Sequence, residues 1–133
     1  MAGTPDICPT LRYEDAKAAV TLLTEGFGFT ERAVYEGEDG RVRHAELSYG
    51  NGMVMLGSKG GGTDFDQLVA GGGPVTVYVR VDDVDEHHAR AVAQGVEIVM
   101  PPTDQEYGSR DYSARDAEGN VWSFGTYAPG VAG

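Results

Sequence analysis

A repeat at about half the chain length most constrains the fold of this protein. Leu11-Arg12-Tyr13-Glu14-Asp15 reappears as Val79-Arg80-Val81-Asp82-Asp83, an offset of 68 residues. The same offset carries Met53-Val54-Met55-Leu56-Gly57 onto Val121-Trp122-Ser123-Phe124-Gly125. This period is longer than the roughly 20–50 residues of solenoid repeats. It predicts one α+β module that is used twice in the chain.

Hydrophobic periodicity and turn residues predict the element order βαβββ in each module. In the first module, Asp15 should cap a helix that ends at Gly26 to Gly28, and the strands are Ile7–Tyr13, Thr30–Glu36, Val42–Tyr49 and Met53–Gly57. In the second, a helix should run from Asp83 to Gln94, and the strands are Val75–Val81, Val96–Met100 (ended by Pro101-Pro102), Arg110–Arg115 and Val121–Tyr127. The modules span about residues 6–58 and 75–127 of a single domain of residues 1–133. The glycine-rich segment 59–74 is expected to be a flexible linker.

Composition excludes several classes of function. The chain has ten Lys and Arg residues and 21 Asp and Glu residues, which gives a net charge of −11. This charge makes nucleic acid a poor partner and favours a cationic ligand. The simpler interpretation is that the acidity only maintains solubility. No stretch approaches the roughly 20 apolar residues of a membrane span, and residues 1–10 lack the features of a signal peptide. The single cysteine, Cys8, rules out a disulfide within the chain and fits a reducing compartment. We therefore expect a cytoplasmic protein.

Alternation along the strands predicts which side chains face away from the helices. The rows Val75, Val77, Val79, Val81 and Ala45, Leu47, Tyr49 should pack under the helices, and so should Trp122 and Phe124. That leaves polar rows on the opposite faces: Thr76, Tyr78 and Arg80, His44, Glu46 and Ser48, and Ser123. Such rows either face solvent or, if the two sheets curl toward each other, line a pocket.

His44 and Glu46 lie two residues apart on one strand, so their side chains share a face about 7 Å apart. One ligand or metal ion can reach both, although a surface pair beside a hairpin is the simpler interpretation. His87 and His88 are adjacent on the predicted helix and point about 100° apart, which favours a helix surface over a metal site.

A resemblance to a known superfamily rests on the βαβββ repeat, on the Leu-Arg-Tyr-Glu-Asp opening and on the ending Arg115-Asp116-Ala117-Glu118-Gly119-Asn120-Val121-Trp122. By these features the chain resembles the vicinal oxygen chelate superfamily, also called the glyoxalase/bleomycin resistance/dioxygenase fold. The resemblance runs from Thr10 to Tyr127. It implies two βαβββ modules whose mixed β-sheets are cupped, with helices outside.

The resemblance also implies positions for a divalent metal, which in this chain are Cys8, Glu46, Thr76 and Ser123. Only Glu46 is a strong oxygen ligand, and Thr76 and Ser123 are poor ligands. Too few ligands remain to hold a metal for Lewis-acid chemistry. We therefore expect no metal and no cofactor, as in the metal-free bleomycin-resistance-like branch, whose members bind drugs as dimers.

Two hypotheses follow from different classes of function. The first, which we favour, is a homodimeric protein that binds and sequesters an aromatic or cationic, antibiotic-like molecule without catalysis. The second is an enzyme: a metal-dependent lyase, isomerase or dioxygenase with an atypical Cys8, His44 and Glu46 site, or a metal-free isomerase with Glu46 as base. The expected ligand-binding residues are Thr10, His44, Glu46, Met53, Met55, Thr76, Tyr78, Tyr107, Arg110, Trp122 and Ser123. Trp122 is the weakest of these, because alternation places it in the core.

Overall fold

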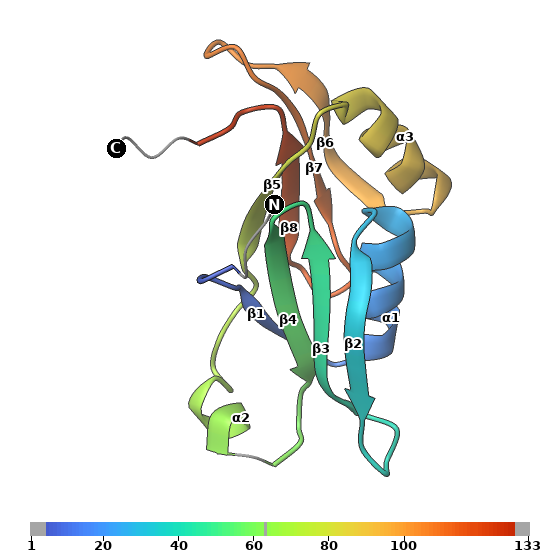
Figure 1. Ribbon diagram of the computed structural model, residues 1–133, viewed down its shortest axis with the longest axis vertical. Helices are drawn as coiled ribbons and strands as arrows, with labels where there is room; N and C mark the ends of the chain where they lie inside the picture. The colour runs from blue at the N-terminus through green and yellow to red at the C-terminus, as the bar shows by residue number, and fades with distance from the viewer. Residues whose placement is uncertain (1–4, 63, 130–133) are drawn as a thin grey trace. The chain divides into compact units, whose positions relative to one another are not determined.

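The computed structural model describes residues 5–62 and 64–129, and the chain divides into two compact units, with the boundary in the sequence between Gly73 and Pro74. Each unit contains one four-stranded mixed sheet and a main helix, in the repeated order that the sequence predicts (Figure 1). Residues 1–4, the start of the segment in which no signal peptide is expected, lie outside the described residues. Among the described helices, none is both long and apolar enough to cross a membrane.

The first unit consists of β1 (Thr10–Tyr13), α1 (Ala16–Thr21), the π-helix η1 (Leu22–Gly26), β2 (Thr30–Glu36), β3 (Val42–Tyr49), β4 (Gly52–Ser58) and α2 (Asp64–Leu68). Its strand order is β1-β4-β3-β2, with β1 parallel to β4 and the other pairs antiparallel. The Asp15 carboxylate accepts a hydrogen bond from the Ala18 N–H, so it caps α1 as predicted. α1 packs against β1, β3 and β4.

The second unit consists of β5 (Thr76–Arg80), α3 (Val84–Ala93), β6 (Glu97–Asp104), β7 (Arg110–Arg115) and β8 (Val121–Gly125). Its strand order β5-β8-β7-β6 reproduces that of the first unit. Asp83 caps α3 by accepting from the Glu86 N–H, as Asp15 caps α1. α3 packs against β6 and β7.

The two sheets share one register. Leu11 of β1 lies opposite Leu56 of β4, and Val79 of β5 lies opposite Phe124 of β8. The two residues of each pair are the same distance apart in the sequence, and each residue of the second pair lies 68 positions after its counterpart in the first. The sequence repeat is therefore a structural repeat. We infer that it exists because each copy must pair the same two strands and bury the same apolar positions under a helix.

Several predicted elements differ from the observed ones. β1 begins at Thr10 rather than at Ile7, and β8 ends at Gly125 rather than at Tyr127. The strand expected to stop at Met100 continues as β6 through Pro101 and Pro102, because β6 is an edge strand with register irregularities, where a missing N–H is tolerated. The segment expected to be a flexible linker contains α2. Val75 precedes β5 and is exposed, so it does not belong to the packed row.

Candidate functional site

The open face of the first sheet brings three of the predicted residues into one row. Thr10 of β1 lies opposite Met55 of β4, and Met55 lies opposite Glu46 of β3. On the other face of β3, Ala45 and Leu47 are completely buried. The alternation predicted for this strand is therefore correct, and it leaves Glu46 half-buried on the face away from α1. Met53 lies in the next row of this face, opposite Ser48.

Glu46 has a partner on its own strand. Its Oε2 lies 2.8 Å from Nε2 of His44, and the two side chains are 37% and 41% exposed. The His44 ring stacks on Tyr35 of β2, with ring centroids 6.2 Å apart and planes 23° apart. The Glu46 carboxylate is therefore oriented by the His44 imidazole, and the His44 ring is held by Tyr35. Glu46 and His44 both stay accessible to a small molecule.

Arg12, which sequence reasoning did not select, spans the neighbouring row. Its guanidinium donates to the carbonyl of Ser58 at 2.8 Å and forms an ion pair with Asp66 of α2. A Cβ at Gly57 would lie 2.8 Å from Nη1 of Arg12, so this glycine leaves room for the arginine to cross the sheet. The contact fixes α2 to the first unit, which explains why the glycine-rich segment is not simply a linker.

The open face of the second sheet carries a different row at the equivalent positions. Thr76, Tyr78 and Arg80 are exposed, whereas Val77 and Val79 are half-buried, as the alternation of β5 predicts. Tyr78 lies opposite Ser123 of β8, whose hydroxyl is 2.8 Å from that of Ser113 on β7. Thr76 lies opposite Val121, one row away.

Two tyrosines, Tyr78 and Tyr107, lie near one carboxylate at the end of this face, and a third, Tyr127, contacts both of them. Asp111 of β7 is only 8% exposed; its Oδ1 accepts from the amide of Gln105 at 2.7 Å, and its Oδ2 accepts a long, 3.4 Å bond from the Tyr107 hydroxyl. Tyr107 packs edge-on against Tyr127 with ring centroids 6.1 Å apart. The Tyr78 hydroxyl donates to the carbonyl of Tyr127 at 2.6 Å. Of the four side chains Asp111, Tyr78, Tyr107 and Tyr127, the sequence analysis had selected only Tyr78 and Tyr107.

Gly125 of β8 makes this arrangement possible. A Cβ at Gly125 would lie 2.7 Å from Cβ of Asp111 and 2.9 Å from the Tyr78 hydroxyl, so both side chains occupy the space that a larger residue would fill. Burial, followed by the negative charge of Asp111, raises the pKa of Tyr78. Desolvation and the same charge raise the pKa of Tyr107. Both phenols therefore stay protonated beside the carboxylate at neutral pH.

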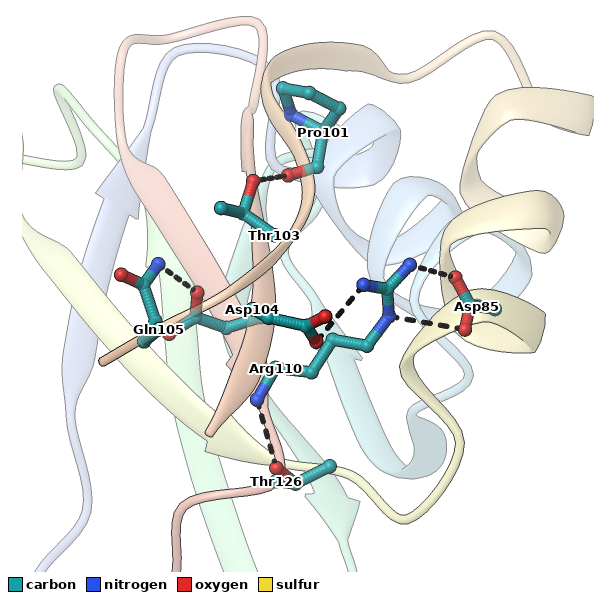
Figure 2. Close-up of polar contacts among 8 residues, drawn as sticks. Asp85, Pro101, Thr103, Asp104, Gln105, Arg110 and Thr126 are labelled. Carbon is teal, nitrogen blue, oxygen red and sulfur yellow. Dashed lines mark hydrogen bonds and ion pairs between the residues drawn. The ribbon is translucent and has the colours of Figure 1, made fainter. Parts of the chain in front are cut away.

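Arg110 lies apart from the tyrosines and braces the fold instead. It donates to both carboxylate oxygens of Asp85 on α3, at 2.9 and 3.2 Å, and to Asp104 of β6 at 3.1 Å (Figure 2). Its backbone N–H donates to the hydroxyl of Thr126. These hydrogen bonds lower the pKa of Asp85 and raise that of Arg110. In this structure Arg110 therefore pairs with carboxylates of the fold, and its expected contact with a ligand stays a prediction.

Trp122 and Cys8 do not belong to the open faces. Trp122 is completely buried, and its indole N–H donates to Asp116 at 3.2 Å, so it occupies the core position that alternation favoured. Cys8 precedes β1 rather than lying on it, and its thiol is directed at the carbonyl of Pro5. The expectation that Cys8 occupies a strand position is therefore wrong.

The chemistry of the donor set tests whether the residues fit a divalent metal. Within residues 5–62 and 64–129, no three His, Cys, Asp or Glu side chains come together in a way that would hold a metal ion. Glu46 and His44 form only a pair. The described residues therefore do not fit the metal site that the superfamily implies, and we derive no step through a metal.

Comparison with known proteins agrees with this architecture. Residues 8–124 match the model of the Glyoxalase/Bleomycin resistance protein/Dioxygenase superfamily. The chain is similar to TioX from Micromonospora sp. ML1, with 36% identity and a TM-score of 0.76 over 91% of this chain and 97% of that one. It is 33% identical to Mb0911c, an uncharacterized protein of Mycobacterium bovis, over 91% of this chain and 82% of that protein. Lactoylglutathione lyase from Agrobacterium tumefaciens shares the fold at 20% identity and a TM-score of 0.67, covering 92% of this chain and 95% of that chain. This chain therefore belongs to the Glyoxalase/Bleomycin resistance protein/Dioxygenase superfamily.

Proposed function

We propose that this protein binds and sequesters a small aromatic or cationic organic molecule, of the kind that antibiotics represent, and does not convert it. The observation that carries the proposal is the row Thr10, Met55 and Glu46 on the open face of the first sheet. It presents a carboxylate beside a thioether, which suits the recognition of a flat, positively charged molecule. Such a function corresponds to the metal-free, bleomycin-resistance-like branch of the superfamily.

The chemistry of the second open face supports the same class of ligand. Tyr78 and Tyr107 offer aromatic surface close to a buried carboxylate. The net charge of −11 attracts cations to the protein as a whole. We also propose that the protein is a homodimer and that it acts in the cytoplasm. Sedimentation velocity of the purified protein tests the dimer, and fractionation of the source cells tests the compartment.

One observation favours a second candidate function, an enzyme of the same superfamily that transfers a proton. The 2.8 Å contact between His44 and Glu46 is the geometry of a carboxylate that shares a proton with an imidazole. Such a pair would abstract a proton from a bound substrate without a metal. The binding function stands first because a carboxylate beside a thioether suits the recognition of a cation by itself, whereas proton transfer also requires a group that stabilises the charge formed on the substrate.

A screen of natural products by thermal shift tests the proposal, because a ligand that binds the folded state raises its stability. We expect cationic aromatic compounds to raise the melting temperature and to be recovered unchanged. Glu46→Gln, which keeps the shape and removes the charge, should weaken the binding of a cationic hit about tenfold or more. Glu38→Gln, at an exposed hairpin position, is the matched control and should leave affinity unchanged. Unchanged affinity in Glu46→Gln contradicts the role of Glu46, and conversion of the hit supports the enzyme.

A further inference from the structure

The Asp111 carboxylate is buried without a cation. Asp111 is 8% exposed, and its carboxylate accepts hydrogen bonds from two neutral donors, the Gln105 amide and the Tyr107 hydroxyl. In the described part of the chain, no Lys, Arg or His forms an ion pair with it. Arg110, its neighbour in the sequence, is committed to Asp85 and Asp104 on the other side of the strand. A buried negative charge normally has a positive partner, so this one is suited to a partner that arrives from outside.

The groups around Asp111 define the chemistry of such a partner. Tyr107 and Tyr127 form an edge-to-face pair, and Tyr78 is tied to the Tyr127 backbone. All three tyrosines keep a substantial exposed fraction, 39% for Tyr78, 51% for Tyr127 and 66% for Tyr107. The faces of tyrosine rings attract cations, and they attract N-alkylated ammonium groups in particular because these give up their weak hydration readily. The three rings and the carboxylate belong to one unit of the structure.

The groups around Asp111 favour one kind of cation. Each carboxylate oxygen accepts one hydrogen bond, from the Gln105 amide or the Tyr107 hydroxyl, and both donors are neutral. The charge of the carboxylate is therefore not compensated by these contacts, and the exposed aromatic surface beside it suits a weakly hydrated cation. A methylated ammonium has few or no N–H groups, so it needs only the charge of the carboxylate and the faces of the rings.

We propose that Tyr78, Tyr107, Tyr127 and Asp111 form a binding site for an N-methylated ammonium group. This inference rests on the proposed function and deepens it, because it assigns the ligand a tertiary or quaternary methylammonium substituent. Gly125 is part of the site, since a side chain there would separate Tyr78 from Asp111. The hydroxyls of Tyr78 and Tyr107 hold the rings in place through the Tyr127 carbonyl and Asp111.

Two probes of the same shape test the site by nuclear magnetic resonance titration of the purified protein. One is choline, and the other is its neutral isostere, in which a tert-butyl group replaces the trimethylammonium group. We expect choline to shift the resonances of Tyr107 and Tyr127, and the isostere to bind at least tenfold more weakly. Asp111→Asn should weaken choline binding about tenfold and leave the isostere unaffected. Glu38→Gln, at an exposed hairpin position in the other unit, is the control for the loss of one charge and should bind choline as the wild type does.

Tyr127→Leu provides a second variant should Asp111→Asn fail to fold, because it removes one exposed ring and keeps the carboxylate. It should weaken choline binding several-fold. Equal binding of choline and its isostere, or wild-type choline affinity in both variants, overturns the site. If natural products bind through Glu46 but choline binds no better than its neutral isostere, only this inference is overturned. Choline bound at Asp111 when no natural product is sequestered supports the site and contradicts the proposed function.

Discussion

Replacing Asp116 by alanine should destabilise the second unit strongly. Asp116 follows β7 in the turn to β8 and is 4% exposed. Its Oδ1 accepts from the backbone N–H groups of Glu118 and Asn120, each at 3.0 Å. Its Oδ2 accepts from the Asn120 amide at 3.0 Å and from the Trp122 indole at 3.2 Å. One carboxylate therefore closes the turn and anchors the largest side chain of the core.

The expected loss can be worked from these contacts. The acceptor of three buried donors disappears, namely the Asn120 backbone N–H, the Asn120 side-chain amide and the Trp122 indole N–H, at a cost of about 1–3 kcal/mol each. The Glu118 N–H is less buried and can turn to water. Relief from burying the carboxylate offsets part of this cost. We therefore expect Asp116→Ala to lower the free energy of unfolding by about 3 kcal/mol.

Urea denaturation followed by tryptophan fluorescence measures this loss, because Trp122 is the single tryptophan of the chain. Asp82→Ala, at an exposed position, should change stability by less than about 0.5 kcal/mol. Trp122→Phe, followed by circular dichroism, removes the indole donor and should cost less than Asp116→Ala. A loss below about 1 kcal/mol in Asp116→Ala refutes the reasoning that the carboxylate supports the core.

Two further predictions concern the tyrosine face. Gly125→Ala should lower the free energy of unfolding by about 1–3 kcal/mol, because the new Cβ overpacks the contact with Asp111 and Tyr78. Gly73→Ala, which has no atom within 4 Å of the new Cβ, is the control and should be close to neutral. Similar losses in the two variants contradict the overpacking at Gly125. The pKa of Tyr78 is raised above its ordinary value of 10.0, so the unfolded chain loses this proton first and stability should fall as pH rises from 10.0 through the folded pKa. Tyr78→Phe should show a shallower fall in urea denaturation at alkaline pH, and an unchanged slope argues against burial beside Asp111 as the cause.

The sequence predicts most of the fold because its local signals agree with one another. Thr30–Glu36, Val42–Tyr49 and Arg110–Arg115 are strands over the predicted residues. Asp15 and Asp83 are helix caps, as their positions before apolar helical runs indicate. Where one signal contradicts its surroundings, the prediction fails. Pro101-Pro102 is typical of a strand end, but an edge position removes the penalty.

The candidate site is less predictable, because tertiary contacts determine it. Asp111 lies in a polar stretch of sequence, and nothing local indicates that its carboxylate is buried. Arg12 appears in the repeated motif only as a polar residue, while its partner Asp66 is far along the chain. A usable signal did exist in Gly57 and Gly125, since a glycine inside a strand often marks the close approach of another group.

The shared register of the two sheets has a consequence for how binding specificity can change. Thr10, Met55 and Glu46 of the first sheet correspond to Tyr78, Ser123 and Ser113 of the second, because each set pairs across equivalent strands. The scaffold is duplicated, but the side chains displayed on it are not. Every ladder hydrogen bond of the described strands lies within its own unit, so the strand pairing of one sheet does not depend on residues of the other. The same backbone register can therefore display one set of side chains in the first unit and a different set in the second.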